Sequence, residues 1–239
     1  MISDLVKRKD GKELLRLSVE EENHEAGLAF AKLVFTGGYS GERINNEEQT
    51  LTKKEMDRHA KDTSRADAQT CIVRGAEVGD LGCIEEAADM YLFGRSLPGT
   101  FGALVIKCTY KKAVVYYQML LEHDYASTEL VGLAHFRMGV LIKALDKNDK
   151  DKDWSLIIYH WELARNFSGE GADLATAQLA RYYYYEKKNY DRAIPLLVSI
   201  QSTSPYSALL LGLAYKHGNG VKKDQFQYNQ LLAHWNKNA

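Results

Sequence analysis

The sequence is poor in residues that interrupt helices and in patterns that bind metals. Proline occurs 3 times in 239 residues, and the 3 cysteines form no CxxC motif. Because proline removes a backbone donor and disrupts a helix interior, its scarcity favours helical structure. A structural zinc site uses about four cysteine or histidine ligands, and none of the 7 histidines has a recognisable metal spacing. We therefore predict no metal site and no cofactor.

An excess of charge and long apolar runs are also missing. The 31 basic and 32 acidic residues leave a formal net charge of -1, which gives no support for nucleic-acid binding. No apolar run approaches the roughly 20 residues needed to cross a bilayer. The first residues lack the continuous apolar segment of a signal peptide. We expect a cytoplasmic protein if Met1 is the true N-terminus, and a periplasmic one if a signal peptide has been removed.

The motifs of common enzymes, such as GxSxG, HExxH and GxGxxG, are missing too, so we predict no catalytic residues. Glu85, Glu86 and Asp89 form an acidic cluster that could hold a cation or a basic side chain, although a solvated helix face is the simpler interpretation. His135 is interpreted as a packed histidine with one bonded nitrogen rather than as a catalytic base. A small hydrolase that uses His135 and this acidic cluster remains an alternative.

The odd number of cysteines favours free thiols over disulfides. We predict reduced and mostly buried cysteines, with Cys83 in a helix position where other segments have serine or alanine. A Cys71–Cys83 disulfide across an interhelical turn is the alternative. Cys108 has no partner in either interpretation.

What the sequence does contain is a repeat of helix starts. Residues suited to cap a helix N-terminus recur about 35 to 45 residues apart, within the range of helical repeats. They are Ser64, Thr109, Asp153, Asn189 and Asp224. Small or bulky apolar residues follow most of these caps at offsets of four, seven and eight, which predicts one packed face for each helix. We call these the capped helices, and we expect Trp154 and Trp161 to lie in the core.

A second helix type alternates with the first and carries a small residue followed three positions later by an aromatic ring or histidine. The small residues are Ala88, Gly132, Ala180 and Gly212, and the later residues are Tyr91, His135, Tyr183 and Tyr215. We call these the intervening helices. A glycine inside a helix costs about 1 kcal/mol relative to alanine, so Gly132 and Gly212 predict close helix crossings.

Before the repeat, residues 1–23 are predicted to form a helical cap of one or two short helices, with Asp10 and Glu13 as a capping pair. Residues 24–239 are predicted to form one repeat domain. In it, residues 26–35 form a helix that ends at two glycines, and a capping box at 52–55 predicts a short helix to about His59.

The segment LGLAYKHGNGVKKD at residues 211–224 resembles the signature of Sel-1-like repeats, relatives of tetratricopeptide repeats. Residues 76–94 and 110–124 match the pattern less closely, and the resemblance covers about residues 24–237. It implies an all-α fold, a right-handed α/α superhelix (solenoid) of about five helix pairs. We accordingly expect no β-sheet between residues 64 and 237.

The resemblance also implies a non-enzymatic protein that binds another protein on its inner face. Some bacterial members act as immunity proteins that neutralise a secreted toxin or effector, and we favour that role. An adaptor or structural subunit of an envelope or signalling complex is the alternative.

The predicted binding surface follows from helix geometry and the resemblance together. At 100° per residue, offsets of −2, +1, +2 and +5 from each small residue point away from the buried stripe of an intervening helix. In Sel-1-like proteins that side lines the concave face. The predicted partner-binding residues are Glu86, Asp89, Arg137, Gln178, Arg181, Tyr182, Tyr185 and His217. Arginine and tyrosine dominate protein-binding hot spots, so we expect Arg137, Arg181, Tyr182 and Tyr185 to be the main anchors.

Overall fold

The computed structural model describes residues 1–39, 41, 53–96, 104–145 and 153–238. The contacts group the chain into two compact units, Met1–Tyr125 and Ala126–Ala239, which we call the N-terminal and C-terminal units. Each is considered by itself. The predicted division at residues 23 and 24 remains a prediction.

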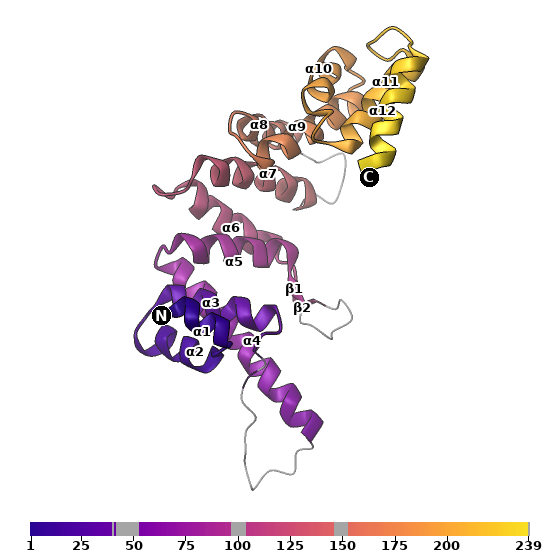
Figure 1. Cartoon of the computed structure of the whole chain (residues 1–239). Helices are drawn as coiled ribbons and strands as arrows, with labels where there is room; N and C mark the ends of the chain where they lie inside the picture. The colour runs from indigo at the N-terminus through magenta and orange to yellow at the C-terminus, as the bar shows by residue number, and fades with distance from the viewer. Residues whose placement is uncertain (40, 42–52, 97–103, 146–152, 239) are drawn as a thin grey trace. The chain divides into compact units, whose positions relative to one another are not determined.

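The N-terminal unit is a series of helices in which each packs on the next (Figure 1). Its elements are α1 (Ile2–Arg8), α2 (Gly11–Glu20), α3 (His24–Phe35), α4 (Lys53–Glu77), α5 (Leu81–Phe93), β1 (Arg95–Ser96), β2 (Leu104–Ile106) and α6 (Tyr110–Leu121). The predicted capping pair at the start of α2 is confirmed, because the Asp10 carboxylate accepts a hydrogen bond from the Glu13 backbone N–H at 3.2 Å. Asn23 caps α3 in the same way, at 2.9 Å from the backbone nitrogen of Ala26.

The helix expected to begin at Ser64 begins earlier. Helix α4 runs without interruption over 25 residues, so the short helix predicted to end near His59 and the capped helix predicted from Ser64 are one element. Ser64 is buried inside it. No glycine or proline lies between Lys53 and Arg74 to end the first helix, and a serine alone does not break a helix. Thr52, the predicted start of the capping box, lies outside the described residues.

The connection between α5 and α6 contains a small β-ladder, so the expectation of no β structure in residues 64–237 is wrong here. Strands β1 and β2 pair antiparallel, with Arg95 opposite Ile106. Val105 and Ile106 are β-branched residues, which favour strands, but the helical repeat on either side led us to expect none here. The ladder leaves the register of the next helix unchanged, because α6 still begins immediately after Thr109.

The C-terminal unit contains the more regular part of the repeat. Its elements are α7 (Thr128–Leu145), α8 (Trp154–Arg165), α9 (Glu170–Arg181), the π-helical turn η1 (Tyr182–Glu186), α10 (Tyr190–Ile200), α11 (Pro205–His217) and α12 (Gln225–Asn238). Three predicted caps are confirmed by hydrogen bonds from backbone N–H groups to the side chains of Asp153, Asn189 and Asp224, at 2.9 to 3.1 Å. Pro195 lies inside α10, which continues past it to Ile200.

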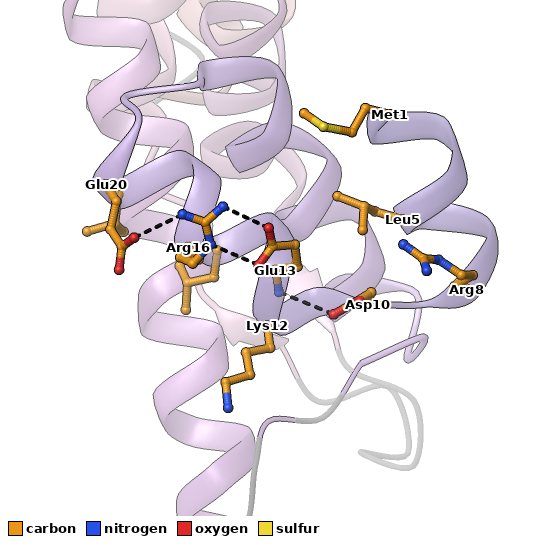
Figure 2. Close-up of a pocket in the computed structure, with 10 residues that line it drawn as sticks. Met1, Leu5, Arg8, Asp10, Lys12, Glu13, Arg16 and Glu20 are labelled. Carbon is orange, nitrogen blue, oxygen red and sulfur yellow. Dashed lines mark hydrogen bonds and ion pairs between the residues drawn. The ribbon is translucent and has the colours of Figure 1, made fainter.

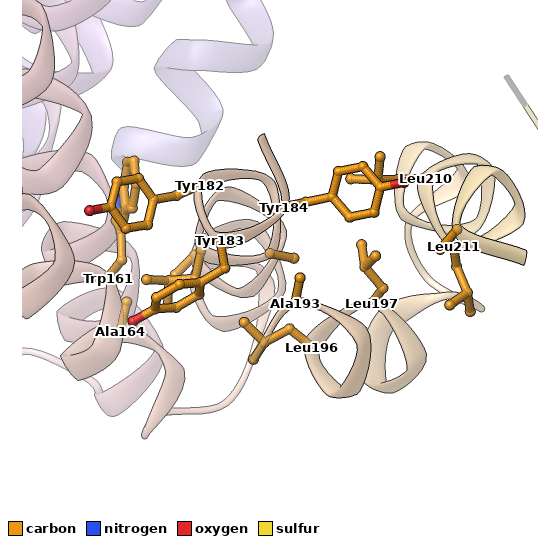
Figure 3. Packing of buried hydrophobic residues seen from close by; sticks show 14 of the residues in the cluster. Trp161, Ala164, Tyr182, Tyr183, Tyr184, Ala193, Leu196, Leu197, Leu210 and Leu211 are labelled. Atoms are coloured by element: carbon orange, nitrogen blue, oxygen red, sulfur yellow. The ribbon is translucent and has the colours of Figure 1, made fainter. Parts of the chain in front are cut away.

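The core of the C-terminal unit is continuous from α8 to α11 (Figure 3). Trp161 is fully buried and Trp154 packs against the cluster, as predicted. Leu210 and Ala214 are also in this core, although the stripe geometry placed them on the outward side of α11. Helix α11 is apolar around most of its circumference and packs on both α10 and α12, so it buries more than one face.

Glycines mark the closest approaches in this unit. A Cβ at Gly212 would lie 3.3 Å from Leu231 Cβ of α12, which confirms the predicted helix crossing. A Cβ at Gly132 would lie 2.8 Å from the side chain of Phe167, and the backbone of Gly132 lies beside Gly171 of α9, so the predicted close crossing at Gly132 is confirmed. The tightest backbone contact is at Gly171 of α9, where a Cβ would lie 2.6 Å from the backbone nitrogen of Leu133. The sequence analysis did not single out Gly171.

These distances predict different costs for the same substitution at two glycines. Gly171→Ala forces a methyl group onto the backbone of α7, which cannot move aside, and should lower the unfolding free energy by about 1–3 kcal/mol. Gly212→Ala, the control, should be close to neutral, because the gain in helix propensity of about 1 kcal/mol offsets a slight displacement of Leu231. Urea unfolding followed by tryptophan fluorescence measures both, and equal effects would contradict the assignment.

All three cysteines are free thiols, and Cys71 and Cys83 are buried while Cys108 is exposed. The Ser18 hydroxyl donates to the Cys71 sulfur at 3.5 Å. Burial raises the pKa of Cys83 to about 12, so its reactive thiolate is scarce at neutral pH. Cys83 is therefore a small packing residue, as its position in the repeat indicated.

We expect one cysteine, Cys108, to react rapidly with an aromatic disulfide reagent in the native protein. All 3 should react after unfolding without reductant. The measurement is the absorbance of the released thiolate, before and after adding guanidinium chloride. A single reactive thiol in the unfolded protein would instead establish a Cys71–Cys83 disulfide.

Candidate interaction surface

The tyrosine run at the end of α9 does not continue the α-helix. Residues 182–186 form the π-helical turn η1, and the Lys187 backbone N–H donates to the carbonyl oxygen of Tyr182, five residues earlier, at 3.2 Å. A π-turn is wider than an α-turn, so each residue advances by less than 100° around the axis. The side chains that follow Tyr182 therefore turn around the axis by less than an α-helical periodicity predicts.

Three of these tyrosines are buried and contact three different elements. The Tyr182 ring lies against Trp154 of α8, with ring centroids 4.5 Å apart. The Tyr183 hydroxyl accepts a hydrogen bond from Arg192 of α10 at 3.0 Å. The Tyr184 hydroxyl accepts one from Asn219, in the α11–α12 turn, also at 3.0 Å. Figure 3 shows Tyr184 directed toward Leu210, and Tyr182 directed away from it.

Tyr182 therefore does not have the exposure that the sequence predicted. Only 5% of its surface is accessible, because α9 packs on α7, α8 and α10 and so buries more than one face, and Tyr182 lies on the face beside α8. Tyr183 is buried as predicted. We do not include Tyr182 in the candidate surface.

Tyr185 is the exposed member of the run, with 47% of its surface accessible. Its partner is Tyr206, which is 45% exposed in the first turn of α11. Burial raises the pKa of Tyr185 first, and the charge and hydrogen bonding of Tyr206 raise it further, while Arg181 acts in the opposite direction. Tyr185 of η1 thus interacts with Tyr206 of α11 and with Arg181 of α9, and we call Arg181, Tyr185 and Tyr206 the tyrosine patch.

Sequence reasoning found two members of the patch and missed Tyr206. The stripe offsets start two residues before the small residue Gly212, and Tyr206 lies outside that range. Of the other predicted residues in this unit, Arg137 and Gln178 are half-buried and His217 is exposed. Their role in binding remains a prediction.

The acidic residues of the N-terminal unit have structural partners. Glu86 accepts hydrogen bonds from the Arg95 guanidinium, with Nε at 3.1 Å, and forms an ion pair with it. The Tyr117 hydroxyl of α6 donates to the Asp89 carboxylate. Glu86 and Asp89 thus join α5 to β1 and α6, and the interpretation of a simple solvated face is incomplete for both.

A groove between α3 and α5 lies beside this ion pair. It has a volume of about 460 Å³ and is lined by Lys32, Phe35, Thr36, Glu86, Phe93, Gly94 and Arg95. Phe93 lies on the predicted stripe and is 55% exposed. An exposed aromatic ring beside a groove is a typical contact for another protein.

A larger cavity of about 910 Å³ lies between α1 and α2 (Figure 2). Arg16 of this cavity donates to the carboxylates of Glu13, Glu20 and Glu21, at 2.8 to 3.0 Å. The Arg16 guanidinium is thus occupied by three carboxylates of the chain itself, which leaves it less available to a ligand.

His135 of α7 contacts His160 of α8, and the two Nδ1 atoms are 3.1 Å apart. Its ring also stacks on Phe167, with ring centroids 6.1 Å apart. Burial lowers the pKa of His135, and burial followed by the charge of His135 lowers the pKa of His160 to about 4. The acidic residues that the hydrolase alternative joins to His135 belong to the other unit, where Arg95 and Tyr117 hold two of them.

Among the described residues, no group of three or more histidine, cysteine or acidic side chains could hold a metal ion. None of the described helices combines the length and the apolar character needed to span a membrane.

Comparison with known proteins identifies the fold. No family model matches the chain, and no curated protein matches it. A solved protective antigen of uropathogenic Escherichia coli strains, which displays an SLR (Sel1-like repeat) fold, aligns over 97% of this chain with a TM-score of 0.51 and 15% identity. A Sel1 repeat protein from Oxalobacter formigenes aligns over 100% of this chain and 98% of its own, with a TM-score of 0.53 and 14% identity. This chain has the Sel1-like repeat fold.

The helix pairs of the Sel1-like repeat fold can be assigned directly. Within the described residues five pairs of consecutive helices pack together: α3 with α4, and then each of the four intervening helices with the helix that follows it, which are α5 with α6, α7 with α8, α9 with α10, and α11 with α12. The predicted all-α class with about five pairs is therefore confirmed, apart from the small ladder of β1 and β2. The chain spans about half the length of the Escherichia coli protein, at 52%.

The positions of Tyr182 and Tyr185 predict effects of different size on the unfolding free energy. Tyr182→Ala removes a buried ring from the core and should lower the unfolding free energy by about 3–5 kcal/mol. Tyr185→Ala removes an exposed ring and should change it by about 1 kcal/mol or less. Urea unfolding of both variants tests this. An unchanged unfolding free energy for Tyr182→Ala would contradict the burial of Tyr182.

Proposed function

We propose that this chain is a non-enzymatic scaffold that binds another protein, and that the tyrosine patch of the C-terminal unit is a main anchor. The observation that carries the proposal is that Tyr185 is exposed and interacts with the exposed residues Tyr206 and Arg181. Tyrosine and arginine are the residues that most often dominate binding energy at protein interfaces. A tyrosine side chain provides a large contact area at a small cost in conformational entropy.

The backbone at the patch is held in place before any partner arrives. Tyr185 directly follows three buried tyrosines of the same π-turn. Tyr206 follows Pro205 at the start of α11, where the Ser204 hydroxyl accepts a hydrogen bond from the Ser207 backbone N–H at 3.3 Å. A pre-organised surface loses less entropy on binding, so more of the contact energy is available for affinity.

The groove between α3 and α5 is a second contact surface in the same proposal. The exposed ring of Phe93 and the ammonium group of Lys32 would contact the partner. Of the residues that the sequence predicted, Glu86 lines this groove and Asp89 lies on the same helix.

Within this class we propose the neutralisation of a secreted toxin by a bacterial immunity protein. Support comes from the Sel-1-like resemblance and from the bacterial origin of both similar structures, those of Escherichia coli and Oxalobacter formigenes. An adaptor or envelope subunit would use the same surface. The activity of the partner discriminates the two roles, because a toxin loses its effect on cells when this chain is co-expressed with it.

The hydrolase alternative is not part of this proposal. His135 belongs to the C-terminal unit and contacts His160 and Phe167 there. Glu86 and Asp89 belong to the N-terminal unit and bond to Arg95 and Tyr117 of that same unit.

The binding test uses single alanine variants and the partner recovered from the native cell and then purified. Tyr185→Ala and Tyr206→Ala should each weaken binding about tenfold, which corresponds to about 1.4 kcal/mol. Tyr159→Ala is the matched control, because Tyr159 is 56% exposed but belongs to the capped helix α8. It should change affinity by no more than about twofold. Isothermal calorimetry measures the dissociation constants, and unchanged binding by folded patch variants would move the site elsewhere.

A further inference from the structure

The contact between His135 and His160 joins the two helices of one repeat pair. The distance of 3.1 Å between the Nδ1 atoms is that of a hydrogen bond. A neutral imidazole has one nitrogen that carries a proton and one that accepts, so one of the two facing atoms must donate to the other. The contact therefore holds one proton between two rings. A second proton at this position converts the accepting ring into a cation and leaves two N–H groups facing each other.

The surroundings of the pair disfavour the positive charge that this proton adds. His160 has only 8% of its surface accessible, and Phe167 stacks on His135. Tyr159 packs its ring edge-on against His160, with ring centroids 5.5 Å apart. A charge in such an environment loses most of its hydration and is poorly screened from its neighbour.

The charged residues of the helices around the pair do not offset this cost. They are Glu129, Arg137 and Lys143 of α7, Glu162 and Arg165 of α8, and Glu170, Asp173 and Arg181 of α9. Glu162 is paired with Arg165 at 2.7 Å. Burial and the neighbouring imidazole are the causes that lower the pKa of His160, and no carboxylate is among the causes for either histidine.

We propose that the His135–His160 contact is acid-sensitive: it holds α7 against α8 at neutral pH and is broken when both facing nitrogens are protonated. The pair would make the C-terminal unit less stable in a mildly acidic compartment than at neutral pH. This role is separate from the proposed binding function, since neither histidine belongs to the tyrosine patch.

The direction of the pH dependence follows from linkage. The pKa of His160 is about 4 in the folded unit, against an ordinary value of 6.5, so the unfolded chain binds the proton more tightly. The stabilisation is fully present above about pH 6.5 and is lost progressively as the pH falls toward 4. Between pH 7.5 and pH 5.5, this histidine alone lowers the folding equilibrium constant about tenfold.

Tryptophan fluorescence measures the effect in this unit alone, because all 3 tryptophans lie in it, at Trp154, Trp161 and Trp235. We expect the melting temperature of the wild-type unit to fall by roughly 5 °C between pH 7.5 and pH 5.5. Ordinary carboxylates titrate below this window, so they contribute little to the change.

The variant that tests the pair is the double substitution His135→Asn and His160→Asn. An asparagine amide places a donor or an acceptor near the position of Nδ1 and does not titrate. The double variant should lose the dependence between pH 7.5 and pH 5.5, and the control His217→Asn should keep it. If the double variant retains the full dependence, the proposal is wrong.

Nuclear magnetic resonance of the wild-type protein decides the question even if the double variant does not fold. The ring C–H signals of His160 should titrate well below pH 6 and together with the loss of native signals from α7 and α8. An ordinary titration near pH 6.5 with the native signals intact would overturn the proposal.

Discussion

The π-helical turn at Tyr182–Glu186 is the constraint on which the C-terminal unit depends. Three consecutive tyrosines are buried here because the segment packs on several elements at once. Tyr182 contacts α8, Tyr183 contacts α10 and Tyr184 contacts the α11–α12 turn. The next residue, Tyr185, then points outward from a backbone that its neighbours hold on three sides. The candidate binding surface is in this sense a consequence of core packing.

Local signals in the sequence predict much of the fold, because the interactions behind them are local. Asp153, Asn189 and Asp224 cap helices through hydrogen bonds to backbone N–H groups two or three residues away. The failure at Ser64 has the same origin. A cap-competent residue starts a helix only where the preceding helix has ended, and nothing between Lys53 and Ser64 ends it.

The candidate site was less predictable, because it depends on contacts between distant residues. The predicted stripe assumed one buried face for each intervening helix, and it assigned Tyr182 to the surface, whereas α9 also packs on α8 and buries it there. Tyr206 meets Tyr185 through the packing of α11 near the end of α9, which no local pattern records. Gly171 is similar, since its backbone neighbour Leu133 lies 38 residues earlier in the chain.

The aromatic position of the intervening helices shows how one substitution changes the chemistry of a repeat. Tyr91 accepts a hydrogen bond from Gln69 of α4, and Tyr183 accepts one from Arg192 of α10. His135 occupies the same position in α7 and bonds to His160 of α8, so all three side chains link an intervening helix to a capped helix. A tyrosine hydroxyl ordinarily titrates near pH 10 and keeps its proton across the physiological range, whereas an imidazole titrates within that range. The same structural link is therefore insensitive to pH in two repeats, and it becomes sensitive in the one where histidine replaces tyrosine.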